Sequence, residues 1–362
     1  MKRLSRTVAI AAYLAFLAVV FEGGSRLLLS MSAVRARVEG PDDASFRLRW
    51  ARRKSGDHPI YYVFDEHDPV RGWRSKPNVR DLVVHGDEIL NTNSRGARGR
   101  REHAQPKPKG VVRVLVFGDS FTFGDEVSDD ETYCAYLEEL LPGVEVVNLG
   151  VHGYGHDQML LYLKEVGAPY EPDVVLLGFL YDDMERNVLR FRDFAKPRYE
   201  LRDGALVLTG TPVPTPEEAL AREPWRSRFS DVLTMLDQRR RARSGQAKEE
   251  TERLSTAILD EFHRTAVGFG ARTAFAYLPV WGELTRTEAS RTARETFFFQ
   301  YCRTRGIQSM YLQPFFLARA REGVKFKAHG HWGPVEHRTA AEGMKAYLLE
   351  KGLIPRRLAP PP

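Results

Sequence analysis

The sequence predicts an α/β protein built on a doubly wound, mainly parallel sheet of about five strands. Two observations lead to this fold class. Short, almost entirely apolar runs recur between residues 111 and 312, as strands buried on both faces do. Between them lie stretches whose apolar residues repeat with helical spacing, and alternating strands and helices are typical of a parallel sheet covered on both faces. A hydrophobic content of 43% supplies the core that such a fold needs.

The individual elements follow from these runs. Strands are expected at 112–117, 144–149, 173–180, 273–278 and 308–312, of which 173–180 is the most hydrophobic. Helices are expected at 130–141, 156–166, around Leu254, Ile258 and Phe262, at 283–304, and at 335–350. Together they predict one domain over residues 111–352. The tail 353–362 is too rich in proline to extend the last helix and is expected to be disordered.

The strand and helix alternation is interrupted between residues 188 and 250. Within this stretch, Asp203-Gly204 separates two alternating runs, which is a strong signal for a β-hairpin. The run Arg239 to Arg243 is expected to be an exposed loop because like charges repel one another. We interpret residues 188–250 as an insertion that forms a cap or lid.

The N-terminus has the pattern of an export signal. Lys2, Arg3 and Arg6 precede an apolar run from Thr7 to Phe21, which at about 15 residues is shorter than the roughly 20 that span a bilayer and would suit a cleavable signal peptide. The apolar character resumes at 27–29, after Glu22 and Arg26, which are spaced to pair on one helix face. An uncleaved signal anchor over residues 1–34 is therefore favoured over a cleaved one. Either way, the positive flank predicts a single-pass protein of a bacterial-type cytoplasmic membrane, with its bulk on the periplasmic side.

Residues 35–110 are polar, basic and rich in turn formers, and we interpret them as a membrane-proximal lead-in. The short runs 61–64 and 82–84 are candidate edge strands, or segments that only pack on the main domain. The stretch Arg95 to Arg101 is expected to be a solvated loop.

Composition excludes some classes of function. The net charge of +6 favours anionic surfaces, but no nucleic-acid-binding motif accompanies it. Cys134 and Cys302 form no C-x-x-C pair, and either two buried thiols or a single disulfide is compatible with them. His152 and His156 lack a convincing third ligand, so neither a metal nor another cofactor is expected.

The first chemical motif is the Gly-Asp-Ser at 118–120, where the strand 112–117 ends and a helix begins. Ligands of open α/β sheets bind at this carboxyl edge, and backbone N–H groups at a helix start stabilise developing negative charge. Ser120 is thus a candidate nucleophile. The alternative is that Ser120 only caps the helix.

The stretch 118–124 resembles the first block of the SGNH (GDSL-like) hydrolase superfamily, and the later blocks follow in order. The resemblance, to the membrane-anchored branch in particular, spans most of residues 60–350 and implies a flavodoxin-like sheet. Residues 148–155 resemble the second block, which implies that the Gly153 N–H binds the oxyanion. A glycine turn between strand and helix would explain the same residues.

The third block of the family ends in Gly-x-Asn-Asp, whose asparagine amide is the third oxyanion donor. This chain has Asp182 at the asparagine position, within 178–183. Losing one such donor costs about 10² to 10³ in rate. Asp182 would still donate if burial and the neighbouring Asp183 kept it protonated.

The last block resembles Asp-Gly-His-Trp, followed by a second histidine. Here His331 matches the general base, while His329 replaces the aspartate that orients it. Loss of that orienter costs about 10⁴ in well-studied serine hydrolases, and Glu336 or a backbone carbonyl is a candidate substitute. His337 is expected to be a structural cap of the final helix.

The resemblance implies an extracytoplasmic serine esterase acting on ester bonds, in particular O-acetyl and other O-acyl groups of carbohydrates, with no cofactor and no nucleic-acid partner. An O-acyltransferase would use the same acyl-Ser120 intermediate. The departures at Asp182 and His329 motivate a second hypothesis, a glycan-binding or assembly protein that has lost turnover. Trp281 and the aromatics at 297–301 are expected to belong to the core rather than to a platform for a sugar ring.

Overall fold

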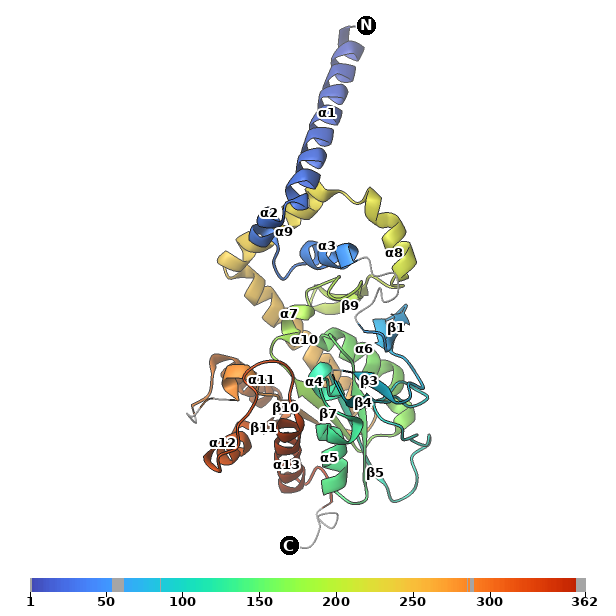
Figure 1. Cartoon of the computed structure of the whole chain (residues 1–362), viewed down its shortest axis with the longest axis vertical. Coiled ribbons are helices and arrows are strands. Elements are labelled where there is room, and N and C mark those ends of the chain that lie inside the picture. The colour runs from blue at the N-terminus through green and yellow to red at the C-terminus, as the bar shows by residue number, and fades with distance from the viewer. Residues whose placement is uncertain (1, 54–61, 85, 285, 287–289, 356–362) are drawn as a thin grey trace.

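The predicted fold class is confirmed by the computed structural model, which describes residues 2–53, 62–84, 86–284, 286 and 290–355. Five parallel strands form the central sheet in the order β11-β10-β7-β5-β6 (Figure 1). They are β5 (Val112–Gly118), β6 (Val144–Gly150), β7 (Val174–Phe179), β10 (Arg272–Tyr277) and β11 (Gln308–Tyr311). The strand order reverses after β6, so β5 lies beside β7 at a topological switch point, where such sheets bind ligands.

Two sets of helices cover the sheet. One face carries α6 (His156–Val166), α10 (Gln246–Gly268) and α11 (Ala293–Arg305), and the other carries α5 (Tyr133–Leu140), α12 (Gln313–Arg321) and α13 (Pro334–Glu350). Alternate side chains of each strand enter the two cores: Leu115 of β5 packs with the first set and Val116 with the second. This two-sided burial explains why the strands are almost entirely apolar. Helix α12 lies in a segment for which no helix was predicted.

The lead-in folds against the main domain without joining its sheet. It contains two antiparallel pairs, β1 (Asp65–Asp68) with β2 (Gly72–Ser75), and β3 (Leu82–Val84) with β4 (Glu88–Leu90). The run 82–84 is thus a strand, but it pairs with 88–90 and not with the main sheet. Residues 62–64 form no strand, and residue 61 lies outside the described residues.

The N-terminal segment is one continuous helix, α1 (Lys2–Ser30), which extends away from the domain (Figure 1). Its stretch from Arg6 to Ser30 is long and apolar enough to cross a membrane, and most of its apolar side chains are exposed, whereas Leu29 near its end is buried. The expected ion pair is present, with Arg26 Nε 2.8 Å from Glu22 Oε1. Helices α2 (Ser32–Val38) and α3 (Asp43–Arg53) follow.

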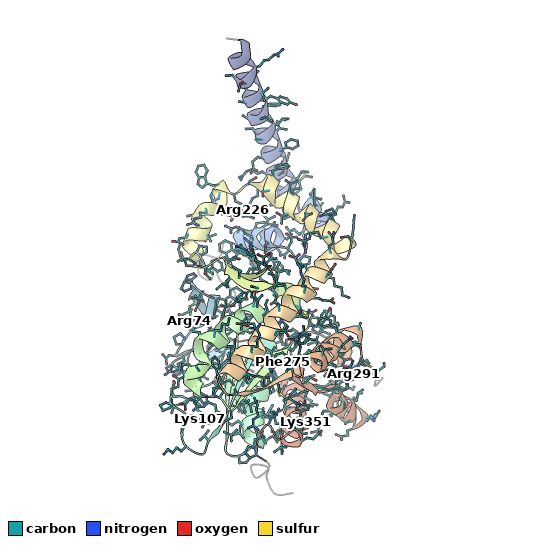
Figure 2. All side chains as sticks on the ribbon, turned by 180° about the vertical axis from the view of Figure 1, so that it is seen from behind. Arg74, Lys107, Arg226, Phe275, Arg291 and Lys351 are labelled. Atoms are coloured by element: carbon teal, nitrogen blue, oxygen red, sulfur yellow. The ribbon has the colours of Figure 1, made fainter. Side chains whose placement is uncertain are left out.

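The segment 188–250, predicted as an insertion, lies between the long apolar helix α1 and the domain. The predicted hairpin is confirmed as β8 (Arg198–Arg202) and β9 (Ala205–Thr209). It is followed by α8 (Pro216–Arg222), the short 3₁₀ helix η3 (Glu223–Trp225) and α9 (Arg228–Arg243), which contacts α1, α2 and α3. These elements form an arch beneath α1 in Figure 1, and Figure 2 labels Arg226 at this junction.

The arginine run at 239–243 is the last turn of α9, so its prediction as a loop was wrong. Two of its charges are neutralised by carboxylates, because Arg240 pairs with Asp237 and Arg241 with Glu250. Cations are also favoured at a helix C-terminus, where they interact with the helix dipole.

Candidate active site

The turn after β5 places Ser120 at the carboxyl edge of the sheet. Asp119 caps the short helix α4 (Ser120–Phe123), since its carboxylate accepts the Phe121 N–H at 3.0 Å. Ser120 is therefore the first helical residue rather than the cap. The turn lies so close to the neighbouring strand that a Cβ at Gly150, the last residue of β6, would be 2.3 Å from the backbone nitrogen of Phe123.

His331 reaches Ser120 from the loop before α13. Its Nε2 lies 2.8 Å from Ser120 Oγ, within hydrogen-bond distance. The imidazole packs on Phe121, with ring centroids 4.9 Å apart. The next residue, Trp332, is buried and donates its indole N–H to the Pro279 carbonyl at 3.1 Å, which anchors the loop. The structure thus brings the predicted nucleophile and the predicted base together.

The neighbour of the other imidazole nitrogen is a residue that the sequence analysis did not identify. Glu126 Oε1 lies 3.5 Å from His331 Nδ1 and also accepts the backbone N–H of His331 at 3.5 Å. His329 is exposed and makes no ion pair or hydrogen bond with the described residues. The suggested substitute, Glu336, caps its own helix by accepting the N–H groups of Gly333 and Lys327. Glu126 is therefore the carboxylate placed to orient His331.

Arg98 holds the loop that carries Glu126. This guanidinium is buried, donates to the carbonyls of Gly124 and Val127, and pairs with Asp129 at 2.6 Å. The stretch 95–101 is a loop whose arginines at 95, 100 and 101 are exposed, as expected, but the expectation of a solvated side chain was wrong for Arg98. Glu126 itself has a positive φ of 65°, a conformation that few residues other than glycine adopt. The loop is thus fixed from inside the domain.

The charge of Glu126 is stabilised by its neighbours. Burial raises its pKa, but the hydrogen bonds from the Lys327 ammonium and from the His331 backbone outweigh this effect, and the net pKa is lowered. Glu126 is therefore a carboxylate at neutral pH. A negative charge beside Nδ1 favours the tautomer whose Nε2 accepts a proton from the serine.

Two backbone N–H groups are candidates for stabilising an oxyanion. The N–H groups of Ser120 and Gly153 have no acceptor among the residues that the structure describes. Gly153 has φ of +66°, a conformation that favours glycine, and a Cβ at this position would lie 2.6 Å from Asp193 Oδ2 and displace that carboxyl group. Burial raises the pKa of Asp193, which favours its neutral form beside this glycine.

Asp182 faces a cation. Its Oδ1 lies 2.9 Å from Nη1 of Arg294 in α11, and a quarter of the side chain is exposed (24%). Burial raises the pKa of the next carboxyl group, Asp183, well above its usual value. Asp183 lies with Asp119 around a single arginine, Arg186, which pairs with both. The third donor of the family is therefore not reproduced by an amide here.

The remaining histidines have separate surroundings. His152 is buried among aromatic rings, and its Nδ1 lies 2.8 Å from Asp125 Oδ1. His156 stacks on Phe179, and burial lowers its pKa to about 3. His337 has a structural role, although its Nδ1 accepts the Tyr133 N–H at the start of α5 and not a group of its own helix.

Cys134 and Cys302 are both buried and free, on opposite faces of the sheet. As expected, the aromatic side chains of Phe298, Phe299 and Tyr301 are buried. Trp281 differs from the expectation: it is 41% exposed, and its indole N–H donates to the Gly330 carbonyl at 3.2 Å, one residue before His331. It also has a positive φ of 47°, which is rare for a bulky residue.

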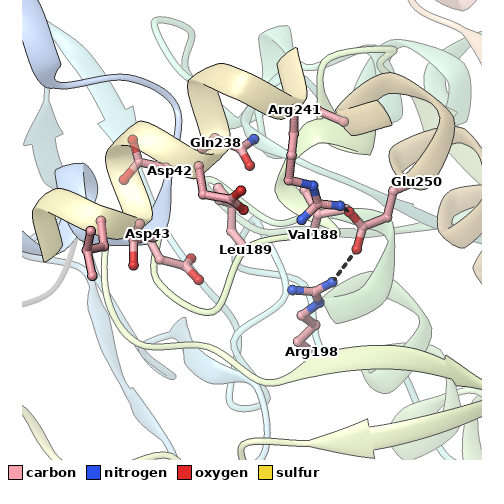
Figure 3. Close-up of a pocket in the computed structure, with 12 residues that line it drawn as sticks. Asp42, Asp43, Val188, Leu189, Arg198, Gln238, Arg241 and Glu250 are labelled. Carbon is pink, nitrogen blue, oxygen red and sulfur yellow. Dashed lines mark hydrogen bonds and ion pairs between the residues drawn. The ribbon is translucent and has the colours of Figure 1, made fainter. Parts of the chain in front are cut away.

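A cavity of about 390 Å³ lies apart from Ser120, between α3, α9 and α10 (Figure 3). Its wall includes Arg198 and Arg241, and both pair with Glu250. Because the cavity lies apart from Ser120, it adds no catalytic group to the site.

Comparison with known proteins gives structural likeness only. No protein-family profile and no curated protein sequence matches the chain. The crystal structure of TesA aligns with 67% of this chain and 99% of its own, at 14% identity and a TM-score of 0.40. The psychrotrophic esterase EstA from Pseudoalteromonas sp. aligns with 66% of this chain and 97% of its own, at 12% identity and a TM-score of 0.39. Axe2, an acetylxylan esterase from Geobacillus stearothermophilus, aligns with 67% of this chain and 96% of its own, at 13% identity and a TM-score of 0.37. Likeness at this level carries no argument about the reaction, which is argued from the site.

Proposed function

We propose that this protein is a membrane-anchored serine esterase whose nucleophile is Ser120. The observation that carries the proposal is the 2.8 Å contact between Ser120 Oγ and His331 Nε2 at the carboxyl edge of the sheet. Nucleophile and base within hydrogen-bond reach, with a carboxylate on the far side of the base, form the arrangement that activates a serine.

Each group has a role in acyl transfer. His331 Nε2 takes the Ser120 proton as Oγ attacks the ester carbonyl carbon, and the N–H groups of Ser120 and Gly153 bind the oxyanion. The ester C–O bond then breaks, and His331 returns the proton to the leaving alcohol. Water attacks the acyl-serine with His331 again as base, which releases the carboxylic acid and restores the hydroxyl. A sugar hydroxyl in place of this water would make the protein an acyltransferase.

We propose an acylated carbohydrate as the substrate class. Trp281 supports this choice because it is exposed beside the loop of His331 while its indole N–H is already bonded to Gly330. The faces of an aromatic ring whose polar group is satisfied are suited to the apolar faces of sugar rings. The resemblance of the sequence blocks to the SGNH superfamily points to the same chemistry.

We propose that α1 stays attached as a membrane anchor. Glu22 accepts hydrogen bonds from Ser227 Oγ at 2.9 Å and from the backbone of Arg228 at 3.0 Å, and Arg26 donates to the Arg226 carbonyl at 3.0 Å. Cleavage C-terminal to Arg26 would remove both partners of the segment that begins α9. These contacts support an anchor rather than a cleaved signal, with the domain on the periplasmic side.

The test is covalent labelling of the full chain in detergent with a fluorophosphonate, together with hydrolysis of p-nitrophenyl acetate. We expect labelling of the wild type, loss of both signals in Ser120→Ala, and loss of turnover in His331→Ala. His263→Ala is a matched control, since this histidine lies on α10 and bonds to Thr273. A wild type that is neither labelled nor active would overturn the proposal.

A second candidate is a glycan-binding protein of this fold without turnover. It is favoured by Asp182, which pairs with Arg294 where the family has an amide donor. Binding of an acetylated oligosaccharide to the wild type with no fluorophosphonate labelling would select this candidate. Labelling that depends on Ser120 would exclude it.

A further inference from the structure

The end of the apolar helix α1 is joined to the inserted arch by a compact set of contacts. Glu22 receives the N–H groups of Arg228 and Phe229 at the start of α9, at 3.0 and 3.1 Å. Arg26 donates to the carbonyls of Pro224 and Arg226, and the ring of Phe21 stacks on Phe229 with centroids 5.1 Å apart. The segment from η3 to the start of α9 is therefore fixed at the level of residues 21–26 of the membrane helix.

The length of the apolar run places this junction at the bilayer surface. Fifteen helical residues from Thr7 to Phe21 span roughly 22 Å at about 1.5 Å per residue, whereas the hydrocarbon core is about 30 Å thick. The difference of about 8 Å corresponds to roughly five further residues, up to Arg26. Glu22 can lie there because its carboxylate is fully hydrogen-bonded. The headgroup layer then begins where η3 contacts α1.

The most exposed aromatic side chain described in the protein lies at this level. Trp225 is 89% exposed, in contrast to the buried Trp50, Trp73 and Trp332. A notch of about 580 Å³ between α1 and the arch is lined by Phe21, Trp225 and Phe229. Tryptophan is enriched at membrane interfaces because its ring is apolar and its N–H remains hydrated. The interface of a bilayer would therefore accommodate an exposed tryptophan at this level.

A cationic cavity adjoins Trp225. It has a volume of about 430 Å³ and is lined by Arg47, Arg222, Trp225, Arg226, Ser227 and Ser230. Arg47 pairs with Glu223 at 2.8 Å and Arg226 with Asp231 at 2.6 Å. Arg222 is exposed and makes no ion pair with any residue that the structure describes. Glu223 and Asp231 also pair with Arg228, so positive charge exceeds negative charge around the cavity, and Arg222 is the arginine of its lining that has no carboxylate partner among the described residues.

We infer that this cavity binds the phosphodiester of a membrane phospholipid, with Trp225 inserted at the boundary between headgroups and acyl chains. Arg222 supplies the compensating charge, since a guanidinium matches phosphate oxygens in geometry and charge. The inference rests on the proposed anchoring by α1, because that helix sets the depth of the cavity. It gives the inserted arch a second membrane contact, which fixes how the domain is oriented over the bilayer.

The first experiment measures the depth of Trp225. The full chain is placed in nanodiscs of phosphatidylcholine and phosphatidylglycerol, with acyl chains unmodified or brominated near the headgroup, and tryptophan emission is compared. We expect brominated lipid to quench the wild type and Trp281→Phe, and Trp225→Phe to lose most of that quenching. Trp281 is the matched control because it is the other exposed tryptophan that the structure describes and lies beside the active site.

The second experiment measures bound lipid. After transfer to detergent, phospholipid phosphorus per protein is determined for the wild type, Arg222→Gln and Arg253→Gln, whose arginine is likewise exposed but lies on α10. We expect about tenfold weaker retention in Arg222→Gln only, as for loss of one charged hydrogen bond. Excess inorganic phosphate should not displace the lipid. Displacement would indicate a general anion site and overturn the assignment to a lipid.

The outcomes separate this inference from the anchoring on which it rests. If the chain enters the discs but Trp225→Phe is quenched as strongly as the wild type, the inference fails and the anchor stands. If the chain does not co-purify with the discs at all, the anchoring fails and the inference fails with it. Esterase activity plays no part in either readout.

Discussion

Replacing Glu126 tests whether this residue has taken over the role of the missing aspartate. In Glu126→Gln the side chain keeps its size and loses its charge beside His331 Nδ1, 3.5 Å away. Coulomb's law gives about 5 kcal/mol for unit charges at this distance with an effective dielectric constant of about 20, and about 1 kcal/mol in water. Because the two side chains are 25% and 33% exposed, a value of about 2 kcal/mol is expected. This corresponds to a loss of about 30-fold in kcat/KM.

The assay is hydrolysis of p-nitrophenyl acetate over a range of pH. Besides the lower kcat/KM, the acidic limb of the profile should move to lower pH, because an imidazolium would lose its neighbouring negative charge. Glu139→Gln is the matched control, since Glu139 pairs with Arg338 on the surface. A merely structural role of Glu126 would change melting temperature and activity together without moving the profile.

A compensating change makes the test sharper. In the double variant Glu126→Gln/His329→Asp, a carboxylate stands at the position that the family uses, and at least part of the lost activity should return. An unchanged kcat/KM in Glu126→Gln would refute the assignment outright. If His329→Asp does not restore the lost kcat/KM, a carboxylate at position 329 cannot replace the one at position 126.

Three further substitutions test other parts of the structure. Asp182→Asn should raise kcat by about tenfold or more, since an amide donates to an oxyanion and a carboxylate does not; a fall in kcat would show that the carboxylate is required. Trp281→Ala should raise KM for an acetylated oligosaccharide about fivefold without changing KM for p-nitrophenyl acetate, as expected for loss of ring stacking; equal changes for both substrates would contradict the role as a sugar platform. His337→Asn should weaken the pH dependence of stability. Burial lowers the pKa of His337 from 6.5 to about 3, so its unfolded form takes up a proton first as pH falls. Between about pH 7.5 and 5.5, protonation of His337 in the unfolded chain lowers the free energy of unfolding of the wild type by about 1.4 kcal/mol, and the variant should not show this loss. Urea unfolding at the two pH values measures this change in the free energy of unfolding. The same pH dependence in both proteins would refute the prediction.

The sheet could be predicted because its signals are local. A strand such as β7, buried on both faces, must be apolar throughout, so the run 173–180 was recognisable without knowledge of its neighbours. The hairpin at Asp203-Gly204 was recognisable for a similar reason, because its turn type depends on those two residues. The arginines at 239–243 were misinterpreted because the carboxylates of Asp237 and Glu250 that neutralise them were not considered.

The surroundings of Ser120 and His331 were predicted only in part. Ser120 and His331 stand in recognisable sequence blocks, but the roles of Glu126 and Arg98 depend on which loops meet in space. Glu126 lies six residues after the serine and more than two hundred before the histidine that it contacts. The signal available in the sequence was the acidic cluster at 125–131 directly after the nucleophile block. Trp281 was expected in the core because it lies beside a predicted helix, but 41% of it is exposed.

The position of Glu126 bears on what the replacements at Asp182 and His329 mean for activity. An orienting carboxylate needs only to reach Nδ1 of the base, and two loops lie close enough to supply it: the one before His331 and the one after Ser120. Lys327 in the first loop bridges to Glu126 in the second at 3.3 Å, so the two loops are already joined by charge. Once Arg98 holds the second loop in place, the aspartate of the first is dispensable for orientation. The histidine at 329 therefore does not imply an inactive enzyme, and the departure that still counts against turnover is the paired carboxylate of Asp182.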